Sequence, residues 1–332
     1  WGRVEETLGE DPYVVGTLGA AYVRGLEGAG IVATLKHFAG YSASKAARNH
    51  APVSIGPREL EDMILPPFEM AIREGGARSV MNSYSDVDGL PALASSRLLT
   101  HVLRDRWGFS GTVVADYFAV AFLETTHRVA ADPRAAGILA LEAGLDVELP
   151  STTGYADRAV AVTDGLVDEA YVDRAARRVL RQKIELGMLD PAYDPSSIGD
   201  STDLDSPRNR DVARRLAEQS IVLLSNDGVL PLQVPSRIAL VGPCADDPNT
   251  FMGCYSFPNH VLSRYGGDDL GVDVPTLLDA LRGEVEAEVV HHLGVPVTEA
   301  DRQGLDAAVA AAAGSDVAVV AVGDLAGLFG LG

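Results

Sequence analysis

The sequence has little cysteine, little positive charge and no long apolar run. Its 332 residues include 2 cysteines, Cys244 and Cys254, which cannot form a disulfide framework or complete a structural zinc site by themselves. Lysine and arginine number 27 against 47 aspartates and glutamates, so the formal net charge is -20 and a nucleic-acid backbone would be repelled. No apolar run reaches the ~18 residues of a membrane span. We therefore expect no nucleic-acid partner and no membrane partner.

The candidate metal motifs have the wrong spacing. Residues 86–89 begin like a calcium loop, but Leu90 stands at the fifth position and Arg97 at the twelfth, where a bidentate glutamate is required. His291 and His292 are consecutive on a predicted strand, so they would point to opposite faces. The sequence therefore predicts no metal site.

Short apolar runs alternate with helical patterns over the first two hundred residues, which indicates a parallel α/β domain. The predicted strands cover 31–35, 78–81, 112–115 and 145–149. The predicted helices cover 96–106, 134–143 closed by Gly144, and 168–186 with Asp168 as its N-cap and Gly187 beyond its end. On this last helix, the residues expected to face the core are Val172, Ala176, Val179 and Leu180.

A second unit follows a change in composition. Residues 191–205 are rich in Asp, Ser, Pro and Gly, which predicts a linker between a domain at 1–190 and another at 206–332. The second domain would begin with a capped helix that turns Val212, Leu216 and Ala217 towards a core. Its predicted strands cover 220–224, 237–241, 287–291 and 316–322, with a helix over 299–313. This pattern again favours an α/β arrangement, in a separate sheet.

Polar residues stand at the ends of the first domain's predicted strands, where parallel α/β folds place their chemistry. Asp116 follows the strand at 112–115, and it is either a catalytic carboxylate or the N-cap of a helix over 118–125. Lys36 and His37 could bind two hydroxyls of one ligand, or they could be a surface lysine beside a core histidine.

The order of motifs along the chain resembles glycoside hydrolase family 3, the exo-acting β-glucosidase and β-xylosidase family. An ordered set of motifs is far more specific than any one of them, and this set extends over essentially the whole chain. The matching pieces are Trp1-Gly2-Arg3, Gly9 to Pro12, Lys36-His37-Phe38, Arg48-Asn49, Val80 to Tyr84, Val113 to Tyr117, Ser220 to Pro231, Val322 to Asp324 and Gly327 to Gly330.

The resemblance implies a (β/α) barrel-like first domain followed by an α/β sandwich domain, both incomplete. Asp116 would be the nucleophile of a retaining mechanism with a covalent glycosyl-enzyme, and Tyr84 would orient it. The residues implied to bind the terminal, non-reducing sugar are Arg3, Lys36, His37, Arg48 and Tyr84. The cations among them are expected to hold the pKa of Asp116 down. No metal or organic cofactor is implied, because protein carboxyl groups carry this mechanism.

The sequence also departs from the family pattern. In the family, the loop that opens here at Gly327 continues to the glutamate that serves as general acid/base, and these 332 residues do not include that glutamate. The front of the barrel, with a sugar-binding carboxylate, is missing as well. We therefore expect the chain alone to be an inactive or barely active fragment. Because the first residue is Trp1, the sequence predicts no compartment. It also predicts no oligomeric state.

The implied substrates are β-linked oligosaccharides and aryl or alkyl β-glycosides. The run KHFAGYS at 36–42 departs from the pattern of the branch that cleaves N-acetylglucosaminides, and it argues against that branch. The stretches NSYSDVDGL at 82–90 and GCYSFPNH at 253–260 favour a β-xylosidase over a β-glucosidase. Two other classes stay open: a non-catalytic sugar-binding module, and a phosphate-binding enzyme that uses the glycine-rich residues 323–332.

Overall fold

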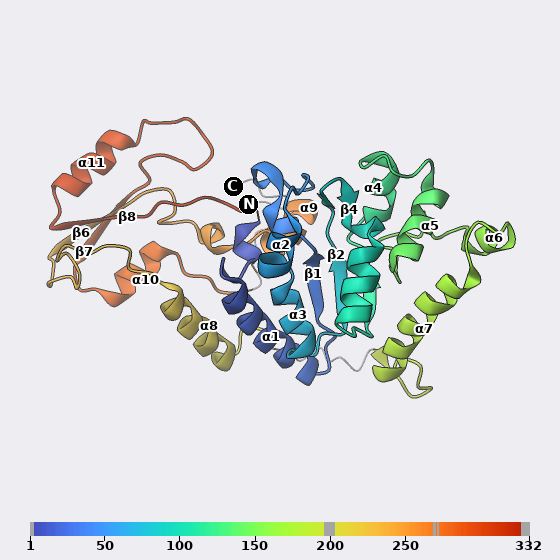
Figure 1. Cartoon of the computed structure of the whole chain (residues 1–332). Coiled ribbons are helices and arrows are strands. Elements are labelled where there is room, and N and C mark those ends of the chain that lie inside the picture. Colours follow the sequence, from blue (N-terminus) through green and yellow to red (C-terminus); the bar gives the residue numbers. More distant parts are fainter. Residues whose placement is uncertain (1–2, 196–202, 268–269, 271, 327–332) are drawn as a thin grey trace. The chain divides into compact units, whose positions relative to one another are not determined.

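The computed structural model describes residues 3–195, 203–267, 270 and 272–326 (Figure 1). The chain divides into two compact units, Trp1–Pro195 and Ser196–Gly332. Each unit combines helices with a parallel sheet, so the predicted α/β class is confirmed. The motif residues Trp1, Gly2 and 327–330 lie outside the described residues.

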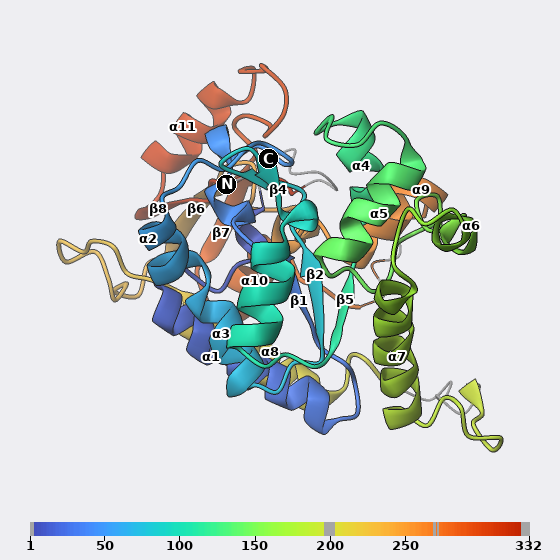
Figure 2. The ribbon, with the colours of Figure 1, turned by 45° about the vertical axis from the view of Figure 1, so that its right-hand side comes forward.

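The first unit is built on a parallel sheet in which β2 (Ser79–Asn82) lies between β1 (Thr34–Phe38) and β5 (Thr112–Val114) (Figure 2). Gly111 precedes β5 at a very close approach, because a Cβ there would lie 2.1 Å from the backbone oxygen of Arg78. The parallel register brings the carboxyl ends of all these strands to one edge of the sheet.

Aspartate followed by proline begins two of the longer helices of the first unit, α1 and α5. The side chain of Asp11 accepts a hydrogen bond from Val14 N at 2.9 Å, and that of Asp132 accepts one from Ala135 N at 2.8 Å. The α-helices are α1 (Pro12–Gly28), α2 (Pro57–Glu59), α3 (Pro66–Arg73), α4 (Ala119–Thr125), α5 (Pro133–Ala143), α6 (Arg158–Thr163) and α7 (Glu169–Glu185). The π-helices are η4 (Leu60–Ile64) and η6 (Arg97–Arg106), and the short 3-10 helices are η1 (Val4–Glu6), η2 (Tyr41–Ala43), η3 (Lys45–Ala47) and η5 (Ala92–Ala94).

One apolar core joins the sheet to η6, α4 and α5. Val80 and Val113 from the sheet pack in a cluster with Leu99, Leu123 and Leu141 from those helices, and all are buried. Full burial of each such side chain contributes about 1.5 to 3 kcal/mol. This core fixes the end of β5, and with it the segment that contains Asp116.

Residues 86–91 form a β-hairpin. β3 (Asp86–Val87) and β4 (Leu90–Pro91) pair antiparallel across Asp88 and Gly89, whose φ angles are 51° and 87°. Asp-Gly with positive φ at both positions suits the tight turns that join such strands. The Asp86 carboxylate accepts the Gly89 N–H at 2.9 Å.

The second unit holds a parallel sheet with the order β7 (Glu288–His292), β6 (Arg237–Val241) and β8 (Val317–Val320) (Figure 1). Alternate residues of β6 serve opposite faces: Leu240 packs with Leu278 of α10, whereas Ala239 and Val241 pack with Ala308 of α11. The helices are α8 (Pro207–Ser220), α9 (Ser263–Tyr265), α10 (Leu277–Glu284), α11 (Leu305–Ala313), η8 (Pro248–Phe251) and η9 (Pro258–Leu262). Nowhere in the described ranges is a helix both long and apolar enough to cross a membrane.

Two predicted strands of the first unit differ from the structure. β1 begins at Thr34, later than the predicted 31–35, because Ile31 N and Ala33 N donate to Leu26 O and the Glu27 carboxylate at the end of α1. Lys36 and His37 therefore lie within β1. The predicted strand at 145–149 makes only an isolated bridge, Val114 to Val147.

The buried face of α7 also differs from the prediction. Ala175 is buried, whereas Ala176 and Leu180 are exposed, Leu180 to 49%. The buried side of the helix carries Tyr171, Val172 and Ala175, which pack against the main core. The prediction was right for Val172 but wrong for Ala176 and Leu180. The buried side is turned because Arg174 and Arg178, though charged, also face inwards, where they bind Leu141 O and the Asp146 carboxylate.

The start of the second unit was predicted wrongly. Residues 220–224 form no strand, and Leu224 is 92% exposed, because this backbone pairs with no other strand in the described part of the chain. Val212, Leu216 and Ala217 of α8 are exposed too, since no apolar surface of the described residues covers them. The predicted helix at 299–313 begins only at Leu305.

Candidate active site

Asp116 lies just beyond the end of β5 and is 8% exposed. Its Oδ1 accepts hydrogen bonds from the Tyr84 hydroxyl at 2.9 Å and from Tyr117 N at 2.8 Å. Its Oδ2 is buried and, within the part of the chain that the structure describes, has no hydrogen-bond partner. The closest ring nitrogen, His37 Nε2, is 3.5 Å away. Hydrogen bonds thus hold Oδ1, whereas Oδ2, called the open oxygen below, accepts none from the described residues.

Asp116 is not the N-cap of the following helix. α4 begins after Phe118, which has a φ of 67° and donates no side-chain cap. Asp116 contributes only its backbone oxygen, which accepts the Ala119 N–H at 3.0 Å. Of the two alternatives drawn from the sequence, the capping one is therefore wrong.

Tyr84 is held on several sides. Its hydroxyl oxygen also lies 2.7 Å from Tyr117 O, so its single O–H hydrogen is shared between that carbonyl and Asp116 Oδ1. The Tyr84 ring packs against His50 and Phe122, with centroids 4.3 and 5.4 Å away. His127 Nε2 lies 2.9 Å from Tyr84 O. Sequence reasoning missed His127, which lies in the loop after α4 and shows no spacing signal.

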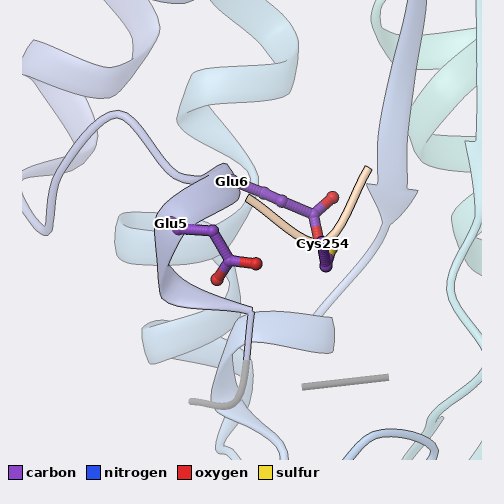
Figure 3. A group of neighbouring side chains, drawn as sticks. All are labelled: Glu5, Glu6 and Cys254. Atoms are coloured by element: carbon purple, nitrogen blue, oxygen red, sulfur yellow. The ribbon is translucent and has the colours of Figure 1, made fainter. Parts of the chain in front are cut away.

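Glu6 joins the two cations nearest the site. It leaves the short helix η1 in a different direction from its neighbour Glu5 (Figure 3). Its carboxylate accepts from Arg3 Nη2 at 2.7 Å, from Arg3 Nε, and from Lys36 Nζ at 3.2 Å. Arg3 Nη1 in turn lies 3.4 Å from His37 Nε2. Sequence reasoning missed Glu6, which stands three residues after Arg3, between the first two matching motifs.

His37 is a neutral imidazole near neutral pH. Burial is the main cause that lowers its pKa to about 3, and the positive charges of Arg3 and Lys36 act in the same direction. Its 3.5 Å approach to Asp116 is therefore not a salt bridge at neutral pH, even though a protonated ring would form one. As a neutral ring it offers one N–H donor and one acceptor nitrogen.

The pKa of Asp116 is raised above the ordinary aspartate value, chiefly because burial disfavours the charged form. The Tyr84 hydroxyl, the Tyr117 amide and the charges of Arg3 and Lys36 act in the opposite direction. We expected the cations to hold this pKa down. The cations do lower the pKa of Asp116, but burial raises it by more, so the expectation of a lowered pKa was wrong.

The structure gathers most of the predicted sugar-binding residues around Asp116. Tyr84 contacts Asp116 directly, and His37, Arg3 and Lys36 are linked to it through the contacts above. Arg48 is exposed in the loop after η3, and its side chain makes no ion pair or hydrogen bond with any described residue. Its place in a sugar site stays a prediction.

Comparisons with known families match both units. The model of the glycosyl hydrolase family 3 N terminal domain matches residues 1–182, more than half of the chain. The chain belongs to glycosyl hydrolase family 3. The family's C-terminal domain model matches residues 221–327, so the family resemblance seen in the sequence is confirmed for both halves.

Curated and solved relatives of this family 3 chain act on different sugars. A β-xylosidase of Formosa agariphila is 34% identical over 97% of this chain and 46% of its own length. A periplasmic β-glucosidase of Salmonella typhimurium is 31% identical over 99% of this chain and 46% of its own. The crystal structure of a β-glucosidase from Listeria innocua with isofagomine matches 99% of this chain with a TM-score of 0.86 at 32% identity, and 46% of that chain is covered. The chain spans about half the length of the relatives it matches.

Proposed function

We propose that the complete protein is a retaining exo-β-glycosidase that removes terminal, non-reducing β-D-xylosyl or β-D-glucosyl residues, with Asp116 as nucleophile. The observation that carries this proposal is the difference between the two carboxylate oxygens of Asp116. Oδ1 accepts two hydrogen bonds, while the buried Oδ2 accepts none from the described residues. In the reaction, Oδ2 would attack the anomeric carbon, the glycosidic C–O bond would break, and water would later hydrolyse the covalent intermediate.

The donors beside Asp116 suit the hydroxyls of a terminal sugar. Neutral His37 lies 3.5 Å from the open oxygen, Arg3 contacts His37, and Lys36 shares the Glu6 carboxylate with Arg3. Arg48 is proposed to join these donors. Such hydrogen bonds accelerate the reaction where they strengthen as the oxocarbenium-like transition state develops. Retaining chemistry also needs a second carboxyl about 5 to 5.5 Å from the first, as general acid/base. We assign that role to none of the residues present here.

Within this reaction we propose a preference for xylosides. The stretches at 82–90 and 253–260 support it, and so does the similarity to the β-xylosidase of Formosa agariphila. A single missing hydroxymethyl group changes specificity by only about 1 to 3 kcal/mol. We therefore expect measurable turnover of both sugars, with the xyloside faster.

The decisive experiment uses mechanism-based labels on the complete protein. It is incubated with a 2-deoxy-2-fluoro-β-xyloside or its gluco counterpart and then mapped by peptide mass spectrometry. A sugar adduct on the peptide that contains Asp116 is expected, and the faster label identifies the preferred sugar. Sugar binding with no adduct would instead indicate a non-catalytic binding module. Binding of inorganic phosphate with no sugar binding would indicate a phosphate enzyme.

Tyr84→Phe is expected to raise the pKa of Asp116 further. The substitution removes a hydrogen bond that stabilises the charged carboxylate, so the acidic limb of the labelling rate moves to higher pH. The pH dependence of labelling by the 2-fluoro-xyloside measures this shift. Tyr13→Phe, at an exposed position on α1, is the matched control. An acidic limb identical to that of the unmodified enzyme would contradict the assigned role of Tyr84.

Glu6→Gln is expected to weaken sugar binding by about tenfold, because the uncharged amide no longer holds Arg3 and Lys36 together. Glu6 raises the pKa of His37, so its loss lowers that pKa still further and leaves the imidazole neutral. The weaker binding therefore cannot arise from a change in the charge of His37. Calorimetry with a sulfur-linked xyloside measures the affinity, and Glu5→Gln on the same short helix is the control. An unchanged affinity would count against the role of Glu6.

A further inference from the structure

We propose that Asn82 is a positioning residue for the reaction: its side-chain oxygen holds the backbone of Asp116 and so sets where the open carboxylate oxygen lies. The inference rests on the function proposed above. Asn82 is the last residue of β2 and is fully buried. Its Oδ1 accepts the Asp116 N–H at 3.1 Å, while its Nδ2 donates to Ser83 O at 2.8 Å.

The hydrogen bond from Asp116 N to Asn82 Oδ1 lies just beyond the point where the backbone pairing of β2 with β5 ends. β2 and β5 are in parallel register from Ser79 with Thr112 to Met81 with Val114, and the pairing stops there. Asp116 lies beyond this last pair, so its amide has no strand partner on the β2 side. The Asn82 side chain reaches across and accepts that amide hydrogen bond.

The other edge of the same segment is held by backbone alone. Ala115 N donates to Val147 O at 2.8 Å, and Phe118 N donates to Leu149 O at 3.0 Å. Asp116, between them, is bound towards β2 by Asn82. Residues 115–118 are therefore hydrogen-bonded on both edges: to backbone oxygens of Val147 and Leu149 on one edge, and to the Asn82 side chain on the β2 edge.

The amide has the right chemistry for this position. It accepts from Asp116 N and donates to Ser83 O at once, and it brings no charge next to the Asp116 carboxylate. A leucine of similar size would fill the volume but leave the Asp116 N–H without an acceptor. An aspartate would keep an acceptor but bury a second negative charge beside the nucleophile, which raises the pKa of Asp116.

The test measures positioning separately from folding and binding. The complete enzyme, Asn82→Leu and Asn82→Asp are labelled with the 2-fluoro-xyloside at several pH values, and the maximal labelling rate is resolved from the affinity. Misplacement of a reacting group by ~1 Å costs about 100-fold in rate, so Asn82→Leu should label about 10- to 100-fold more slowly, with affinity changed less than about threefold. Asn82→Asp should recover part of the rate, with its acidic limb at higher pH.

Ser79→Ala supplies the matched control, since Ser79 is a buried polar residue at the opposite end of the same strand. It should label at the rate of the unmodified enzyme. Equal labelling rates for folded Asn82→Leu and the unmodified enzyme would overturn the inference, as would equal losses in Asn82→Leu and Ser79→Ala. If Asn82→Leu does not fold, an unshifted acidic limb in Asn82→Asp overturns it. Absence of labelling in the unmodified enzyme would instead refute the proposed function.

Discussion

Asp116→Asn in the complete enzyme should lower kcat/KM by about 1,000-fold or more. The substitution keeps the shape of the side chain and the acceptor that Tyr84 and Tyr117 N occupy, but it replaces the open oxygen with an amide nitrogen that cannot attack the anomeric carbon. Loss of a covalent nucleophile costs activity on this scale because no other group can form the intermediate. Binding of the sugar should change little, since Arg3, Lys36 and His37 are untouched.

The assay is steady-state hydrolysis of an aryl β-xyloside, with Asp105→Asn as the control. Asp105 is an exposed carboxylate on η6, and its substitution should leave activity unchanged. Asp116→Gly sharpens the assignment, because added azide can enter the vacated space and attack the anomeric carbon while the aglycone departs. The expected product is a glycosyl azide of inverted configuration. Kinetics of Asp116→Asn that match the unmodified enzyme would refute the nucleophile role.

Asp146→Ala should destabilise the first unit by about 3 to 5 kcal/mol, the range for removal of one partner from a buried ion pair. The Asp146 side chain is fully buried, and its carboxylate accepts from Arg104 Nη2 at 2.8 Å, Arg178 Nη1 at 2.9 Å and Val113 N at 2.8 Å. Without it, both arginines lose this buried anionic partner. Burial already lowers the pKa of Arg104 to about 10, which shows how poorly this environment solvates its charge.

Urea-induced unfolding measures the change, and Asp173→Ala provides the comparison. Asp173 pairs with Arg177 at 3.2 Å on the exposed face of α7, where a salt bridge contributes at most about 1 kcal/mol. Asp146→Asn should fall between the two, because it keeps some hydrogen bonds but loses the charge. Equal destabilisation by Asp146→Ala and Asp173→Ala would show that the buried pair contributes no more than a surface pair.

Asp146 also bears on the site through β5. Its carboxylate binds Val113 N, while Asp146 N and Val147 N donate to Val113 O. These bonds hold the strand three residues before Asp116. A destabilising change at Asp146 is therefore expected to reduce labelling of Asp116 as well, even though the Asp146 carboxylate binds Arg104, Arg178 and Val113 N and not Asp116.

Local features of the sequence predicted much of the fold. Asp168 caps α7, Gly144 follows the end of α5, and the continuous apolar run at 238–241 lies in β6, because caps, turns and short apolar runs depend on residues close in the chain. The ordered motifs likewise identified the family and singled out Asp116. These predictions needed no knowledge of distant contacts.

The tertiary structure alone decided the details of the site. Asn82 lies 34 residues from Asp116, and Glu6 lies 30 residues from Lys36, so only the strand register and the packing of η1 reveal these contacts. The net rise in the pKa of Asp116 likewise depends on burial, which the sequence does not display. The sequence by itself determined the family, the fold class and the candidate nucleophile. Tertiary structure decided which side chains hold that nucleophile and how its charge is balanced, because hydrogen bonds and desolvation depend on distances between chain segments far apart in sequence.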